Sequence, residues 1–140
     1  MTQQSELKRP QPFSMNFTKP YWDATRDKRL VLQYCPTSRK YQHYPRPVSV
    51  HTGRRDVEWR EVDGSGVVYA YTVTRRGPEA FRGHEPYLIA TIQLDADVLF
   101  MANVVNCPID AIKIGMRVKP NWEPLPDGTH LLQFEPESLA

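Results

Sequence analysis

The sequence has few of the features expected of a secreted or membrane-spanning protein. Its 140 residues include only two cysteines, Cys35 and Cys107, and no signal of basic, apolar and small residues precedes them. A disulfide framework is therefore not expected, and the reducing cytoplasm is the expected location. No apolar run approaches the roughly 20 residues that a membrane-spanning helix requires, so we expect no membrane association.

Net charge and catalytic motifs are also scarce. The formal charge is +2, whereas nucleic-acid binding usually needs a concentrated basic stripe rather than a slight excess. The sequence contains no glycine-rich phosphate loop, HExxH pair or nucleophile elbow. Because no nucleophile lies near them in sequence, the histidines are expected in surface loops or turns: His43, His51, His84 and His130. We therefore assign no catalytic residue.

Strand-forming patterns dominate the middle of the chain. Apolar residues recur at every second position over Leu88–Leu94, which predicts a strand with one buried face. The turn-forming segment Asp95–Asp97 and the apolar run Val98–Val105 then predict an antiparallel hairpin whose second strand is covered on both sides. The two aspartates are interpreted as turn residues rather than as a catalytic carboxylate pair.

Three further segments complete a five-stranded barrel of the OB type. Val67–Thr74 is β-branched and aromatic, and the preceding Gly64–Gly66 permits a bulge or sharp bend. Lys113–Val118 leads into another strand, and Leu131–Phe134 would close the barrel. Prolines between these two segments interrupt regular pairing and place Trp122 on an edge or loop. The expected fold class is mainly β, and 13 prolines favour short elements.

The N-terminal part is expected to be a tail followed by a short helix. Residues 1–15 are polar and contain prolines, which predicts a flexible tail. From Asn16 to Leu30, Thr18 as a cap and Pro20 at an early helical position predict a helix. Leu30–Tyr34 is then expected to form a strand.

Two short turns follow that strand. Cys35–Ser38 and Ser49–Gly53 have the spacing of a pair of zinc knuckles, each of which presents two ligands to a tetrahedral ion. Cys35 is the only thiol at the four ligand positions, and neutral hydroxyls, which are poor zinc ligands, occupy the others: Ser38, Ser49 and Thr52. We expect a degenerate ribbon without zinc or another cofactor. A remodelled site with ligands from His43 and His51 is the alternative.

The order and spacing of several segments resemble one known family. They are Tyr21–Ala24, Leu30–Cys35, Tyr44–Pro47, Gly66–Val73, Pro86–Ala90 and Ile114–Val118. The bacterial and archaeal family that they resemble joins a rubredoxin-like zinc ribbon to an OB-fold. It was long labelled a domain of unknown function and is associated with thiolase-like and acyl-CoA enzymes. The resemblance extends over residues 17–136. It implies a helix and degenerate ribbon over residues 16–56 and an OB-fold barrel over residues 57–140.

The resemblance also implies a noncatalytic accessory subunit of an acyl-CoA enzyme, namely a thiolase-like acyltransferase, a condensing enzyme or an aldolase. Tyr21 and Trp22 would dock the partner, because exposed aromatic residues are enriched at interfaces. The long loop from residue 75 to residue 85 would help to enclose the acyl-CoA site, since arginines suit phosphates and an aromatic side chain suits a flat ring. Its ligand-binding residues are Arg75, Arg76, Phe81 and Arg82, and Arg54 and Arg55 extend the same basic cluster.

Other interpretations stay open at this point. An OB-fold can bind single-stranded nucleic acid by aromatic stacking, and Tyr69, Tyr71 and Arg75 would serve, although the slight charge excess argues against it. An independent enzyme acting on CoA esters would require turnover by the purified chain. For the site residues, the structural alternatives are solvated loop arginines and a Trp22 packed on its own barrel.

Overall fold

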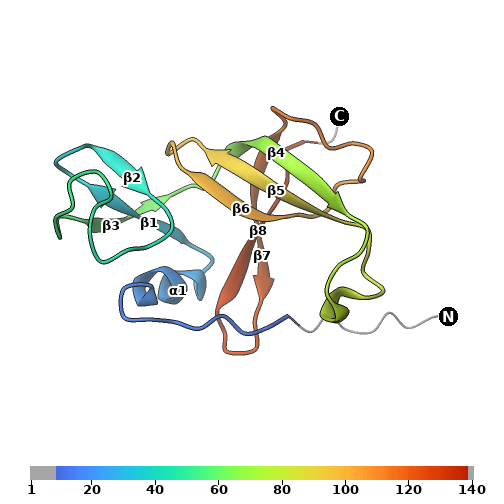
Figure 1. Ribbon diagram of the computed structural model, residues 1–140, viewed down its shortest axis with the longest axis horizontal. Helices are drawn as coiled ribbons and strands as arrows, with labels where there is room; N and C mark the ends of the chain where they lie inside the picture. Colours follow the sequence, from blue (N-terminus) through green and yellow to red (C-terminus); the bar gives the residue numbers. More distant parts are fainter. Residues whose placement is uncertain (1–8, 139–140) are drawn as a thin grey trace.

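The computed structural model describes residues 9–138, in which a small sheet lies beside a closed β-barrel (Figure 1). Residues 1–8 of the expected tail lie outside the described residues. The described end of that segment is held in place, because Arg9 Nε donates to Glu123 Oε2 at 2.5 Å. No helix within residues 9–138 is both long enough and apolar enough to span a bilayer.

The predicted short helix is present as α1 (Lys19–Thr25). Pro20 lies in its first turn, where a missing N–H removes no helical hydrogen bond. The side chain of Thr18 does not cap the helix as expected, because its hydroxyl oxygen accepts instead from the Met15 N–H, at 2.8 Å. The helix contacts a strand of the small sheet, β1, and a strand of the barrel, β8, so it bridges the two parts.

The small sheet has three antiparallel strands in the order β2, β1, β3. They are β1 (Leu30–Cys35), β2 (Lys40–Gln42) and β3 (Glu58–Val62). Residues 57–62 were expected to belong to the barrel, but β3 pairs with β1 along its whole length. Periodicity identifies a strand without identifying the neighbour to which it binds, because that choice depends on residues distant in sequence.

Five strands close the barrel in the order β4-β5-β6-β8-β7, which confirms the predicted OB-type barrel. Neighbouring strands are antiparallel except β6 and β8, which run parallel. The strands are β4 (Gly66–Thr74), β5 (Tyr87–Leu94), β6 (Leu99–Val104), β7 (Arg117–Pro124) and β8 (His130–Pro136). A 3-10 turn, η1 (Glu79–Phe81), lies in the loop between β4 and β5. Residues 108–112 include a single turn, closed by a hydrogen bond from the Ala111 N–H to the Pro108 carbonyl oxygen at 2.9 Å.

The alternation predicted for β5 is confirmed. Leu88, Ala90, Ile92 and Leu94 are each no more than 2% exposed, and they belong to the same core cluster as Phe134, which is fully buried. Burying a side chain of this size stabilises the fold by roughly 1.5–3 kcal/mol. The inward face of β5 therefore forms the centre of the barrel core.

The expectation that the β6 strand is covered on both sides is wrong. Phe100 and Val104 point into the core and are 6% and 4% exposed, but Leu99 and Met101 are 47% and 60% exposed. A run that is apolar on both faces shows that both faces are suited to burial. It does not show that the chain itself supplies the second cover.

Gly66 lies where strands approach each other closely. It pairs with both β5 and β7, and a Cβ atom at this position would lie 2.5 Å from the carbonyl oxygen of Gln93. Only a residue without a side chain fits this corner. The bulge expected near Gly64–Gly66 occurs slightly downstream, between Val68 and Ala70 of β4.

Strand β7 continues through Pro120 and Trp122, so the expected interruption of pairing is not found. β7 pairs with β8 from Val118 to its end, whereas β4 pairs only with the first two residues of β7. The remaining side of β7 is therefore free of partners among the described strands. A residue without an N–H group is tolerated on such an edge. Trp122 lies on this edge, as expected, but within a strand and half-buried.

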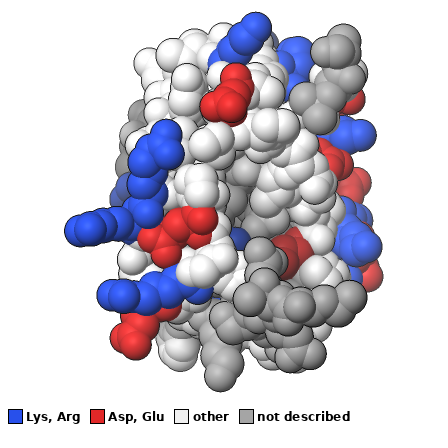
Figure 2. All heavy atoms as spheres, turned by 90° about the vertical axis from the view of Figure 1, so that its right-hand side faces the viewer, with Lys and Arg blue, Asp and Glu red and all other residues white. Residues whose placement is uncertain are grey.

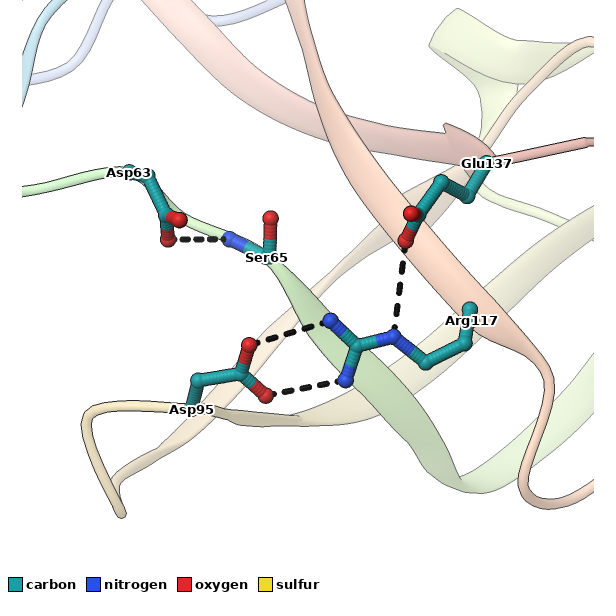
Figure 3. A network of polar contacts seen from close by, with 5 residues as sticks. All are labelled: Asp63, Ser65, Asp95, Arg117 and Glu137. Atoms are coloured by element: carbon teal, nitrogen blue, oxygen red, sulfur yellow. Dashed lines mark hydrogen bonds and ion pairs between the residues drawn. The ribbon is translucent and has the colours of Figure 1, made fainter.

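A charged network joins the ends of several barrel strands (Figure 3). Arg117 donates to both carboxylate oxygens of Asp95, at 2.9 and 3.0 Å, and to Glu137 at 3.4 Å. The hydrogen bonds from the Arg117 guanidinium hold the pKa of Asp95 below its usual value. Asp95 is therefore an ion-pair partner, and Asp97 takes the turn conformation at φ 63°. Neither serves as half of a catalytic carboxylate pair.

Candidate ligand and partner sites

The loop between β4 and β5 lies at the end of the barrel remote from the small sheet (Figure 1). Arg75, Arg76 and Arg82 on this loop are exposed, and none has an ion-pair partner in the described part of the chain. The loop is braced from within, because the Gly77 N–H donates to Glu85 Oε2 at 2.8 Å. Three free guanidinium groups are thus available for an anionic ligand.

The wider basic cluster expected from the sequence does not form. Arg54 and Arg55 lie in the connection between β2 and β3, on the small sheet, and the β4–β5 loop lies at the opposite end of the molecule (Figure 1). The sequence could not reveal this, because the whole of β3 in the small sheet and the whole of β4 in the barrel separate the two arginine pairs. Only the three loop arginines can act on one ligand.

Phe81 forms part of a hollow at the same end. Its ring lies 5.0 Å from that of Tyr87, and the Arg9 guanidinium lies 5.2 Å from the Phe81 ring centroid. The hollow has a volume of about 230 Å³ and also includes Asn103 and Glu123. On the face of the molecule at this end, charged groups of both signs lie along the margins, and the centre is hollowed and mostly uncharged (Figure 2). Phe81 therefore belongs to the wall of a hollow, and its role in ligand binding stays a prediction.

A larger hollow lies between α1, the segment after β2, and the strands β6 and β8. This apolar groove has a volume of about 380 Å³. Among residues 9–138, no lysine, arginine, aspartate or glutamate lines it. Its walls are mainly aromatic and aliphatic, including Tyr21, Trp22, Tyr44, Phe100, Met101 and Leu132. A cavity of this size and character is typical of binding sites for apolar ligands.

Stacked rings fix the walls of the apolar groove. The His43 ring stacks on Phe100, with centroids 4.3 Å apart and planes at 15°, and Phe100 meets Phe134 of the barrel core edge-on at 5.9 Å. Tyr21 meets Trp22 edge-on at 5.0 Å. The groove is therefore continuous with the packed core, and its walls are positioned by contacts worth about 0.5–1.5 kcal/mol for each aromatic pair.

His43 is the main polar group in this apolar wall. Both ring nitrogens are buried and have no hydrogen-bond partner among the described residues. Burial lowers the pKa of His43 to about 4, so the ring is neutral at pH 7. Leaving a buried polar group unpaired costs about 1–3 kcal/mol. The expectation of a surface histidine is wrong here.

His130 also departs from that expectation. It lies in β8, and its Nδ1 is 2.7 Å from the carbonyl oxygen of Thr25 in α1. The side-chain hydroxyl of Thr25 accepts from the His130 N–H at 3.1 Å. This contact joins the helix to the barrel. This contact could not be predicted from the sequence, because Thr25 and His130 are 105 residues apart.

The two predicted docking residues differ in exposure. Tyr21 is only 6% exposed, and burial raises the pKa of its hydroxyl above the usual value. Trp22 is half-buried and packs against the core. Tyr21 therefore lines the apolar groove from within, and Trp22 presents part of its ring outside. Partner docking through these residues stays a prediction.

The degenerate knuckles are held by a hydrogen-bonded cluster. The buried thiol of Cys35 donates to Asp56 Oδ2 at 3.7 Å and accepts from the Ser38 N–H at 3.5 Å. Asp56 also accepts from the Thr52 hydroxyl at 2.8 Å. The side chains of Ser38 and Ser49 hold the pKa of the Cys35 thiol below its usual value. Asp56, which the sequence analysis did not single out, connects the two turns.

This donor set does not fit a structural zinc ion. Such sites use four thiolate or imidazole ligands, whereas one thiol and neutral hydroxyls are present, and a carboxylate already binds two of these groups. Within residues 9–138, no three His, Cys, Asp or Glu side chains are grouped as a metal site would require. The alternative site does not form either, because His43 stacks on Phe100 while His51 lies by the Tyr41 carbonyl.

The sequence carried one signal of the apolar groove that the analysis did not use. The run Val98–Val105 is apolar on both faces, and its outward residues lie at the rim and side of the groove. The opposite wall comes from α1 and the segment after β2, which are far from β6 in sequence. Only the fold brings these walls together.

Known proteins resemble this chain in both sequence and structure. The family profile described as "ChsH2, C-terminal OB-fold domain" matches residues 59–123. A Thermomonospora curvata protein described as a probable enoyl-CoA hydratase alpha subunit is 35% identical over 127 residues, which are 86% of this chain and 39% of that protein. A DUF35 domain-containing scaffold protein of Pyrococcus furiosus is 31% identical over 101 residues, or 71% of this chain and 73% of that protein.

The fold as a whole is shared with a solved structure. The protein described as the Ltp2-ChsH2(DUF35) aldolase matches with a TM-score of 0.81 and 29% identity, over 91% of this chain and 100% of that chain. The match therefore includes the small sheet as well as the barrel. By contrast, the chain spans only 39% of the length of the Thermomonospora relative.

Proposed function

The chain belongs to the DUF35 family, and from this membership we propose that it is a noncatalytic accessory subunit of an acyl-CoA enzyme. The partner would be a thiolase-like acyltransferase, a condensing enzyme or an aldolase. The names of three relatives support the proposal, since they describe a scaffold protein, an enoyl-CoA hydratase subunit and an aldolase. Of these names, that of the hydratase subunit mentions CoA, and that of the scaffold protein indicates a role in assembly.

The observation that carries the proposal is the exposed apolar surface beside the groove. Leu99 and Met101 project from β6 and are 47% and 60% exposed, and Tyr44 is 52% exposed. Met101 and Tyr44 also line the apolar groove, so the exposed surface and the groove are continuous. Apolar surface of this kind marks sites of association with proteins or ligands. A partner protein that covers this exposed surface would also bury the apolar groove.

The two parts of the chain would have different roles. The helix and the small sheet would dock the partner through Tyr21 and Trp22, and the barrel with its β4–β5 loop would help to enclose the acyl-CoA site. The chain itself lacks an activated nucleophile among the described residues. Cys35 has a lowered pKa, but its thiol is fully buried and hydrogen-bonded to Asp56, so no substrate can reach it. Burial raises the pKa of the Cys107 thiol, which opposes thiolate formation.

Kinetic assay of separate and mixed proteins tests the proposal. The purified chain should turn over no acyl-CoA, whereas its addition to a thiolase-like partner subunit should produce activity that neither protein has in full alone. Co-elution of the two proteins in gel filtration provides the matching binding measurement. Robust thioester cleavage by the isolated chain would contradict the accessory role.

Nucleic-acid binding is the second candidate function. Tyr69 and Tyr71 are 56% and 41% exposed, and Arg75 forms no ion pair with another described residue, as a stacking surface would require. The mixture of positive and negative side chains at the loop end is unfavourable for a phosphate backbone (Figure 2). A salt-dependent mobility shift of a labelled single-stranded oligonucleotide would support this alternative over the accessory role.

A further inference from the structure

The N-terminal arm, residues 9–18, crosses one side of the barrel before α1 begins. In Figure 1 this segment passes α1, runs across the β7–β8 hairpin and comes close to η1. Residues 9–15 belong to no helix or strand, and Pro10 and Pro12 have no N–H to donate. Gln11 and Ser14 line a hollow together with Asp127, in the turn between β7 and β8. Side-chain contacts therefore hold the arm against the barrel.

Arg9 of the arm lies in the hollow that Phe81 lines. Its Nε donates to Glu123 Oε2 at 2.5 Å, and its guanidinium lies 5.2 Å from the centroid of the Phe81 ring. The side chain of Arg9 is only 16% exposed, and that of Glu123 is 32% exposed. This arrangement combines a half-buried ion pair with a cation–π contact. One residue of the arm thus connects strand β7 to the turn η1.

The barrel fixes both groups that contact the guanidinium. Gln133 of β8 is 5% exposed, and its Nε2 donates to the same Glu123 oxygen at 3.1 Å. Phe81 packs on Tyr87 of β5, with ring centroids 5.0 Å apart. A Cβ atom at Gly77 would lie 2.5 Å from the Tyr87 hydroxyl, so the loop can pass this ring only at a glycine. The carboxylate and the rings therefore have contacts of their own, independent of the arm.

The chemistry of this hollow fits a guanidinium group. Glu123 is the one acidic side chain among its described lining residues. A phosphate or carboxylate would be repelled by it, and an apolar group would bury it without an ion-pair partner. A planar guanidinium can stack on a ring and still direct an N–H group to a carboxylate, whereas the ammonium of lysine is a compact and strongly hydrated charge. An arginine side chain is therefore the best match.

We propose that this hollow is a guanidinium-binding site and that Arg9 makes the N-terminal arm a latch, which holds the β4–β5 loop to the β7–β8 hairpin. With Arg9 in place, Phe81 is covered and the loop is tethered to β7. With Arg9 withdrawn, the loop keeps only its own contacts, such as the hydrogen bond from Gly77 to Glu85. A ligand that uses Phe81 must displace Arg9. The inference concerns the chain alone and does not depend on the proposed accessory function.

Trypsin digestion of the full-length chain measures the latch, because the loop contains cleavage sites after three arginines: Arg75, Arg76 and Arg82. Arg9→Ala should increase the rate of cleavage in the loop about fivefold or more, since a folded segment is cut in proportion to how often it opens. Glu123→Gln should also increase the rate. The double variant should be cleaved little faster than Arg9→Ala, because both substitutions remove the same contact. Mass spectrometry locates the cleaved bonds.

Two further variants separate the latch from a general effect of charge. Arg9→Lys keeps the positive charge without the planar group, so its loop should be cleaved nearly as fast as that of Arg9→Ala. Arg29→Ala is the matched control, since it removes an exposed ion pair with Glu61 of the small sheet, and its loop should be cleaved at the native rate. Thermal unfolding of every variant checks that the barrel is intact.

The cleavage rates decide the proposal. Faster cleavage of the loop in Arg9→Ala and Arg9→Lys, but not in Arg29→Ala, supports the latch. A native rate in Arg9→Ala or in Glu123→Gln would overturn it, because the contact would then take no part in holding the loop. A native rate in Arg9→Lys alone would overturn the guanidinium assignment, because a positive charge would then suffice. These measurements need neither a partner nor a CoA thioester, so none of their outcomes contradicts the accessory role.

Discussion

The ring of His43 stacks on that of Phe100, with centroids 4.3 Å apart and an interplanar angle of 15°. The first residue belongs to the segment that follows β2 of the small sheet, and the second to β6 of the barrel. This contact therefore fixes the position of the small sheet relative to the barrel at the apolar groove. It also removes a titratable ring from water, which has a consequence for stability.

Acid should destabilise the fold through His43. Its pKa is about 4 in the folded chain and about 6.5 when unfolded, so above pH 6.5 the ring is neutral in both states and has no effect. Between pH 6.5 and pH 4 only the unfolded chain takes up the proton, so the free energy of unfolding falls, by up to about 3 kcal/mol. Urea unfolding at several pH values measures this loss.

Two substitutions isolate the contribution of His43 from that of the carboxylates. His43→Phe keeps a ring against Phe100, and its free energy of unfolding should depend less on pH between pH 6.5 and pH 4. His51→Gln changes an exposed histidine in the same part of the chain. In this variant the free energy of unfolding should fall with pH as steeply as in the native protein. Identical pH profiles for the native chain and His43→Phe would show that His43 is accessible to protons in the folded state.

Removal of the loop arginines should weaken acyl-CoA use without unfolding the barrel. Arg75→Ala, Arg76→Ala and Arg82→Ala combined should reduce the apparent affinity of the complex for acyl-CoA by on the order of 1–3 kcal/mol, the value of hydrogen bonds to charged groups. Stability should change little, because exposed charges contribute little to it. The matched control is the double variant Arg54→Ala and Arg55→Ala at the opposite end of the molecule. Equal affinity in both variants would remove the loop from the site.

The native ribbon should contain no stoichiometric zinc, and three substitutions should create a zinc site. Ser38→Cys, Ser49→Cys and Thr52→Cys together with Cys35 would supply four thiolates at the knuckle positions, so about one zinc ion per chain is expected. Elemental analysis of chelator-free protein and cobalt absorption spectra measure this. One zinc per native chain, lost with folding in Cys35→Ser, would contradict the prediction for the natural sequence.

Gly66→Ala should destabilise the barrel. The added Cβ would lie 2.5 Å from the Gln93 carbonyl oxygen, so the β4–β5 pairing must shift, at a cost of about 1–3 kcal/mol. Ser65→Ala is the control, since surface changes are usually within about 0.5 kcal/mol. Chemical denaturation compares the two. If Gly66→Ala is as stable as the native protein, the corner has room for a Cβ atom and the prediction is wrong.

Several features were predictable because they depend on local patterns. The alternation over Leu88–Leu94 fixed which face of β5 is buried, since successive side chains of a strand point to opposite sides. Pro20 predicted the first turn of α1, because its conformation and missing N–H suit that position. The replacement of zinc ligands by hydroxyls at Ser38, Ser49 and Thr52 was likewise visible from residue types alone.

The sequence by itself thus determined the barrel strands, the short helix and the loss of the zinc ligands, since each follows from neighbouring residues. Only the tertiary structure decided which strand pairs with β3, whether the outer face of β6 is covered, and how deeply His43 is buried. It also separated Arg54 from Arg75 and brought Trp22 to the same groove as Phe100. These outcomes depend on contacts between distant segments, and such contacts are set by the packing of the whole barrel rather than by local periodicity.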